Sequence, residues 1–279
     1  MSRLPPGPRA ALAPLAARLL AELRRVRKNP ADVGAIHDAR VAARRLSAAG
    51  EIWLEAGKPL DRLQGRLEKC LRRLGRVRNA DVALEFLADG PAPEAAARTA
   101  LSKGLRRKLK FRRKQLAAWL TVQRFKRLKS TLSRAIPEAR DGAEPPGPRT
   151  LGRQLQTVLG LSIRGRPMAD PAKAHELRRK IRILRYQQES IAAAYSENDT
   201  AALRDLFIHL QDAAGGWHDR FQLDRLAAAI EQKPKYRRAA GLLRRRLASE
   251  MKEASARFVE ALQNLNRLKA ILLGQAGRA

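Results

Sequence analysis

The sequence predicts an all-α fold, made of two bundles of about four helices each that are related by internal duplication. Three observations support this prediction. Alanine, leucine, arginine and lysine, which are strong helix formers, dominate the 279 residues, and alternating runs of β-branched and aromatic residues are absent. Proline and glycine interrupt the helical pattern at a few places. A His-x-x-Arg-x-x-x-Arg motif begins at His37 and again at His175, 138 residues later.

Four helices are expected in the first half, at residues 13–28, 32–56, 60–88 and 93–135. Proline or glycine lies at each break between them. Asp32 stands at the start of the second helix, where its side chain is expected to act as a cap. The longer segments could kink, for example near Gly75 or around Thr121.

The stretch DGAEPPGPR, residues 141–149, is the strongest linker and divides the chain almost in half. It separates a first bundle, residues 12–140, from a second bundle, residues 150–273. The two ends, residues 1–11 and 274–279, are expected to be tails, the first of them flexible. Helices of the second half are expected at residues 150–162, 171–195, 199–231 and 235–273.

The two halves match at several positions when one histidine is aligned with the other. Arg40 then aligns with Arg178, Arg44 with Arg182, and Glu51 with Glu189. The next helix of each half carries a glycine followed four residues later by a small polar or acidic residue, as in Gly75–Asn79 and Gly215–Asp219. Matches at one offset indicate an internal duplication.

The repeated motif places basic side chains on a single stripe of each helix. At about 100° per residue, His37, Arg40 and Arg44 fall within about 60° of one another. Arginine donates paired hydrogen bonds to phosphate or carboxylate oxygens, and histidine adds a donor that depends on pH. The glutamates of the stripes, Glu51 and Glu189, cannot bind phosphate and are expected to position the neighbouring arginines.

Two further helices of the first half carry basic stripes. They comprise Arg62, Arg66, Lys69 and Arg73, and then Lys103, Arg107, Lys110 and Lys114. A charged stripe on a long helix can simply be a solvated face. Four such stripes with few interleaved acids favour a bound anion instead, because like charges four residues apart destabilise a helix by a few tenths of a kcal/mol, about 0.2–0.5 per pair.

The formal net charge is +31, from 58 lysines and arginines against 27 acidic residues. Both halves are basic, so a polyanion is the expected partner: nucleic acid, an anionic membrane or polyphosphate. The single cysteine, Cys70, excludes an internal disulfide and a cysteine-based zinc cluster. The N-terminal residues lack the apolar core of a signal peptide, and no apolar run is long enough to span a membrane. A cytoplasmic location is expected, with no membrane insertion.

These motifs resemble the CHAD family, the conserved-histidine α-helical domain. Both halves of that family carry a His-x-x-Arg-x-x-x-(Arg/Lys) helix, and the second often continues into Arg-Tyr, here Arg185-Tyr186. The helix that follows often ends in a Leu-Gly-x-x-Arg-Asp-x-Asp-Val turn, matched by LGRVRNADV at residues 74–82, with Asn79 in place of the first acid. LQDAAGGWHD is similar to the corresponding turn of the second half. The resemblance extends from about residue 12 to 273.

The resemblance implies two four-helix bundles about a pseudo-twofold axis, with a basic central channel between them. It implies binding of inorganic polyphosphate and association with polyphosphate granules. The composition, rich in alanine, arginine and leucine, suggests a bacterial source. Carried over position by position, the ligand contacts would be His37, Arg40, Arg44, Arg45, His175, Arg178, Arg182 and Arg185. Ser47 departs from the family, which often has an arginine there, so the two halves could contribute unequally.

Two alternatives to polyphosphate binding remain open. A nucleic-acid-binding protein would have the same charge, although only 12 aromatic residues are present and no zinc finger or RNA-recognition motif is visible. A metal-dependent phosphohydrolase would need a ligand set, but no His-x-x-x-His or Glu-x-x-His pair occurs. His209 and His218 have no distinctive spacing and are expected to be structural. The sequence therefore predicts a binding protein without catalysis, cofactor or metal. Polyphosphate-metabolising proteins are conceivable partners.

Overall fold

The computed structural model describes residues 7–136, 170–191 and 197–275. Helices account for nearly all of these residues and no strand occurs among them, which confirms the predicted all-α fold. The predicted linker at 141–149, the predicted helix at 150–162 and most of both predicted tails lie outside the described residues. The first helix begins at Pro8, five residues before the predicted start, so residues 8–11 are not part of a flexible tail.

The described residues fall into two compact units. The first comprises those within Met1–Asp89 and Ser102–Pro146, and the second those within Gly90–Leu101 and Gly147–Ala279. The second unit therefore includes Gly90–Leu101, which the sequence reading placed in the first bundle. The internal duplication and the central channel stay predictions.

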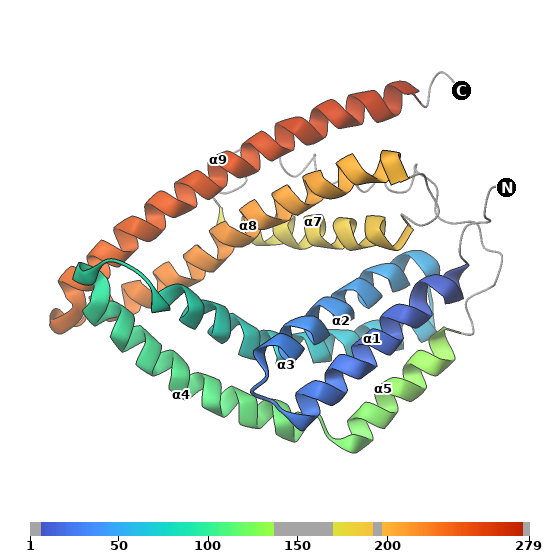
Figure 1. The fold of residues 1–279 in the computed structure, drawn as a ribbon, viewed down its shortest axis with the longest axis horizontal. Coiled ribbons are helices and arrows are strands. Elements are labelled where there is room, and N and C mark those ends of the chain that lie inside the picture. Colours follow the sequence, from blue (N-terminus) through green and yellow to red (C-terminus); the bar gives the residue numbers. More distant parts are fainter. Residues whose placement is uncertain (1–6, 137–169, 192–196, 276–279) are drawn as a thin grey trace. The chain divides into compact units, whose positions relative to one another are not determined.

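The first unit is built from helices that pack in a cycle. α1 (Pro8–Lys28) lies against α2 (Val33–Trp53), and α2 lies against α3 (Lys58–Ala88). α5 (Val122–Ala135) contacts both α3 and α1 (Figure 1). α4 (Ala95–Trp119) begins in the second unit and belongs to the first from Ser102 onward.

The core of the first unit follows from helical spacing. α1 buries residues three or four apart, among them Leu12, Leu19 and Leu23. The facing side of α2 is rich in small residues, such as Ala39 and Ala42, which are fully or almost fully buried. Burying one leucine contributes roughly 1.5–3 kcal/mol, so this interface holds α2 in place and leaves its other stripes for polar residues.

Local signals explain where the helices begin and end. Asp32 caps α2 as predicted, with its Oδ1 accepting a hydrogen bond of 2.8 Å from the Ala35 N–H. Gly57 has a φ of +151° at the turn before α3, a conformation that residues with a side chain rarely adopt. The single helix predicted at 93–135 is divided at Leu120, because Thr121 caps a new helix by accepting a hydrogen bond from the Arg124 N–H. No break occurs at Gly75, since α3 is continuous there.

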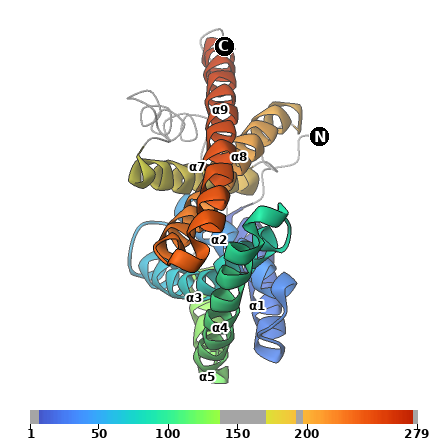
Figure 2. The ribbon, with the colours of Figure 1, turned by 90° about the vertical axis from the view of Figure 1, so that its left-hand side faces the viewer.

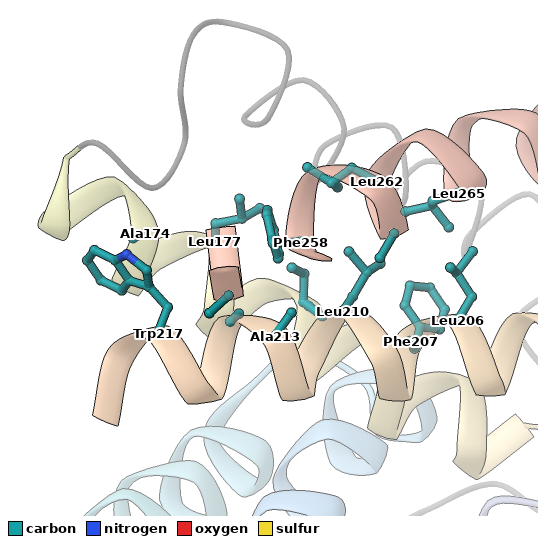
Figure 3. Packing of buried hydrophobic residues seen from close by; sticks show 14 of the residues in the cluster. Ala174, Leu177, Leu206, Phe207, Leu210, Ala213, Trp217, Phe258, Leu262 and Leu265 are labelled. Carbon is teal, nitrogen blue, oxygen red and sulfur yellow. The ribbon is translucent and has the colours of Figure 1, made fainter. Parts of the chain in front are cut away.

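The second unit contains three long helices among its described residues. α7 (Pro171–Ile191) packs on α8 (Glu197–Glu231), and α8 runs beside α9 (Arg237–Gln275), as Figure 2 also shows. Short 3-10 turns, η1 (Ala92–Glu94) and η3 (Pro234–Tyr236), contact α9. The core between these helices is apolar and aromatic (Figure 3), and it includes Phe207, Leu210, Trp217 and Phe258.

One buried carboxylate secures the start of α4 within this unit. Glu94 is 3% exposed, and its carboxylate accepts hydrogen bonds of 2.9–3.1 Å from Nε and a terminal nitrogen of Arg246 on α9. Arg246 also pairs with Glu250, one turn further along α9. This network explains physically why Gly90–Leu101 groups with the second unit.

Candidate functional site

The basic stripe of α2 lies beside α3 at a glycine. His37 is exposed, whereas Arg40 and Arg44 are half-buried. A Cβ added to Gly75 of α3 would lie 3.6 Å from two nitrogens of the Arg40 guanidinium. The missing side chain therefore provides the space in which Arg40 crosses the surface of α3. This space gives a physical reason for a glycine at position 75, one of the two glycines that the sequence places at corresponding positions of the two halves.

A further cation joins this stripe from α3. Partial burial of its ring lowers the pKa of His37 below the usual value, and the positive charge of Arg78 is the next cause. Arg40 and Arg44 act in the same direction, whereas Asp38 opposes them. His37 is therefore held neutral near pH 7, amid arginines. We refer to His37, Arg40, Arg44 and Arg78 as the first cluster.

The second unit brings together a related set of residues, with two histidines. The rings of His175 on α7 and His218 on α8 lie 5.1 Å apart, tilted by 40°. Burial lowers the pKa of His218 to about 4, and the charges of Arg178 and Arg182 contribute to that shift. His218 is expected from the sequence to be structural, and the structure places its ring beside that of the motif histidine His175. We refer to His175, Arg178, Arg182 and His218 as the second cluster.

Arg178 of the second cluster is half-buried. Burial lowers its pKa from the usual value, while the negative charge of Asp219 opposes that shift. Its Nε atom is buried and has no hydrogen-bond partner among the described residues. A buried donor without a partner costs about 1–3 kcal/mol, which an incoming phosphate oxygen would offset.

Sequence reasoning missed Arg78 and His218, although a signal for both was present. Aligning Gly75 with Gly215 places Arg78 opposite His218. The charge of Arg78 lowers the pKa of His37, and the ring of His218 lies 5.1 Å from that of His175. The internal repeat predicts the glycine and the polar residue four positions later, but the signal at the third position after the glycine was missed.

The outer members of the two motifs differ in their surroundings. Arg185 donates from Nε to Glu189 at 2.9 Å, and its guanidinium lies 5.8 Å from the Tyr186 ring centroid. Ser47, at the matching position of α2, instead bonds Gln64 of α3 through its hydroxyl. Arg45 is half-buried and lies about 100° around the helix from Arg44. Glu51 is exposed.

The two additional stripes occupy different surroundings. Arg62, Arg66 and Lys69 line a cavity of about 460 Å³ between α1, α3 and α5, and Arg73 is not among its lining residues. On α4, the side chains of Lys103, Arg107, Lys110 and Lys114 are all exposed.

The buried carboxylate of the turn motif has a structural partner. Asp81 is 5% exposed, and its Oδ1 accepts a hydrogen bond of 3.0 Å from Arg113 of α4. Burial raises the pKa of Asp81, and the charge of Arg113 opposes that shift. Arg112 also donates to the backbone carbonyl of Arg76 at 2.9 Å. These contacts hold α4 against α3.

Among the described residues, no group of three or more histidines, cysteines or acids is arranged to hold a metal ion. No helix in the described part of the chain is both long and apolar enough to cross a membrane. Burial raises the pKa of the Cys70 thiol to about 12, so the thiolate that nucleophilic chemistry needs is not populated near neutral pH.

Comparisons with known proteins agree on one family. The profile of the CHAD domain matches residues 10–228. The crystal structure of the CHAD domain from the plant Ricinus communis is similar, with a TM-score of 0.73 at 19% identity, covering 94% of this chain and 93% of that one. PptA from Streptomyces chartreusis has a TM-score of 0.71 at 17% identity, covering 93% of this chain and 99% of that one. No curated protein matched the sequence.

Proposed function

Because the chain belongs to the CHAD domain family, of which some members bind polyphosphate, we propose that it binds inorganic polyphosphate without catalysis. One observation carries the proposal. Each unit gathers a motif histidine, two half-buried arginines and a cation or second histidine from the next helix. Such a set offers several donors to phosphate oxygens and gives a metal ion few ligands.

The ligand is expected to be a linear chain of phosphates. Each cluster would hold a short stretch of chain through the guanidinium groups of Arg40 and Arg44, or of Arg178 and Arg182. A flexible chain that engages both clusters gains affinity from multivalency, without any new contact. Arg45, Arg185 and the stripes on α3 and α4 stay predicted as additional contacts.

A binding role is favoured over metal-dependent hydrolysis by the charges themselves. The positive charges that lower the pKa of His37 and His175 would also repel a divalent cation placed between them. The proposed setting is the cytoplasm, at polyphosphate granules. A fluorescent fusion that stays diffuse in cells containing granules would contradict that part of the proposal.

The decisive variant reverses one arginine in each cluster. Arg44→Glu with Arg182→Glu should weaken binding of labelled long-chain polyphosphate by at least about 100-fold, because each lost charge-assisted contact contributes about 1.5–3 kcal/mol. Fluorescence anisotropy near physiological salt would measure the affinity, and circular dichroism would verify the fold.

A matched control has the same change in net charge. Lys126 and Lys129 are exposed on α5, and reversing both to Glu should alter affinity by less than about threefold. Equal losses in the two double variants would mean that the +31 charge, rather than the clusters, binds the chain. Competition by DNA or RNA at equal phosphate concentration would favour the nucleic-acid alternative.

A further inference from the structure

The cavity of the first unit is lined by cations from two helices. Arg62, Arg66 and Lys69 come from one face of α3, and Arg124 and Arg127 come from one face of α5. Asp61 is the one carboxylate among the lining residues. The volume of about 460 Å³ falls within the range of about 300–1,000 Å³ that is usual for small-molecule sites.

The cations around this cavity are not matched by carboxylates. Elsewhere in the same unit, Arg25 pairs with Glu22 at 2.8 Å and Arg113 pairs with Asp81 at 3.0 Å. None of the five lining cations forms an ion pair with a carboxylate of the described residues. The resulting repulsion opposes folding unless an anion shares the cavity.

Aromatic rings provide the surface on which some of these cations rest. The Arg124 guanidinium lies 5.6 Å from the Trp119 ring centroid, and Trp119 is half-buried at the end of α4. Arg24 and Arg27 of α1 lie 5.4 and 5.6 Å from the ring centroid of Phe125, which also lines the cavity. Arginine side chains therefore cover the ring faces of Trp119 and Phe125, on which an aromatic ring of a ligand could stack instead.

The walls of the cavity are partly apolar. Leu23, Cys70, Leu128 and Phe125 are buried and line it together with the cations. An inorganic phosphate chain would make no use of such walls. A molecule with an aromatic heterocycle at one end and phosphates at the other would match both parts of the lining.

We propose that this cavity binds a nucleoside triphosphate, with the base against Trp119 and the phosphates against Arg62, Arg66, Lys69, Arg124 and Arg127. On binding, the base takes the ring face that Arg124 covers, and Arg124 turns to the phosphates. No residue of the two clusters lines the cavity, but Arg62, Arg66 and Lys69 also belong to the α3 stripe that is predicted to contact polyphosphate. The test must therefore distinguish ATP from a bare phosphate chain.

The test compares ATP, tripolyphosphate and adenosine by isothermal titration calorimetry on the full chain. ATP should bind at least about 10-fold more tightly than tripolyphosphate, because stacking on an aromatic side chain adds affinity. Trp119→Ala should remove that advantage and bring the two ligands to similar affinity. Equal affinity for ATP and tripolyphosphate in the unmodified chain would overturn the proposal.

Charge reversal on α5 offers a matched pair of variants. Arg124→Glu with Arg127→Glu should weaken ATP binding by at least about 30-fold, because two phosphate contacts are lost. Lys126 and Lys129 lie on the same helix but do not line the cavity. Reversing both to Glu should change ATP affinity by less than about threefold. Equal weakening in both variants would mean that ATP binds only through net charge.

Two further variants keep the test decisive. If the reversed pair unfolds, Arg124→Gln with Arg127→Gln removes both charges without reversing them and should still weaken ATP binding by at least about 10-fold. Arg44→Glu with Arg182→Glu should leave ATP affinity unchanged while polyphosphate binding is lost. A loss of ATP binding in that variant would place ATP at the clusters and contradict a separate site.

Discussion

At the scale of single residues, the histidines of the two clusters are expected to make the proposed polyphosphate binding sensitive to pH. In the free protein the pKa values of His37, His175 and His218 are all lowered, so these rings are neutral at pH 7. A bound polyanion favours the protonated form and raises these pKa values, so binding takes up protons. Polyphosphate affinity should therefore increase as the pH falls from about 7.5 to about 5.5.

The measurement is a pH series of polyphosphate affinities for the unmodified chain and for the triple variant His37→Gln, His175→Gln, His218→Gln. The variant should show a flatter profile. A slope that is the same in both proteins would mean that other groups take up the protons.

The stability of the fold should change in the opposite direction from the affinity. His218 has a pKa of about 4 in the folded protein against about 6.5 when unfolded, so the fold loses stability as the pH drops below about 6.5.

Gly75 tests whether the space beside Arg40 matters. An alanine Cβ there would make ordinary contact at 3.6 Å, so Gly75→Ala should bind polyphosphate normally and gain up to about 1 kcal/mol of stability from helix propensity. Gly75→Leu should displace Arg40 and weaken binding by about 10-fold. Gly104→Leu is the control, since no atom would lie within 4 Å of its Cβ, and it should bind normally.

At the scale of helices, the Glu94–Arg246 pair is expected to hold the start of α4 against α9. Glu94→Ala leaves the half-buried Arg246 without its main partner and should lower the free energy of unfolding by about 3 kcal/mol. Glu68→Ala removes a carboxylate from an exposed pair with Arg72 and should cost less than about 1 kcal/mol. Urea unfolding would measure both, and similar losses would contradict a special role for the buried pair.

At the scale of the whole molecule, the net charge of +31 should couple stability to salt. Added NaCl screens self-repulsion, so the Tm of the free protein should rise between about 50 and 500 mM salt, as the Debye length shortens. Polyphosphate affinity should fall over the same range, with a log–log slope of about −4 if six phosphates are neutralised. The Tm would be measured by thermal unfolding at each salt concentration. An affinity that does not change with salt would argue against phosphate contacts.

The sequence by itself determined the all-α class, most helix boundaries and the two His-x-x-Arg motifs, because periodicity, caps and breakers act over only a few residues. Asp32 caps α2 as predicted for that reason.

Contacts between helices were decided only by the tertiary structure. Arg78 and His218 join the motifs across a helix interface, and α3 and α5 face each other to form the cavity. Glu94 groups with α9, 152 residues away in the chain, through one buried ion pair. Spacing along one helix gives the direction of a side chain, whereas the identity of its neighbour depends on how the helices pack.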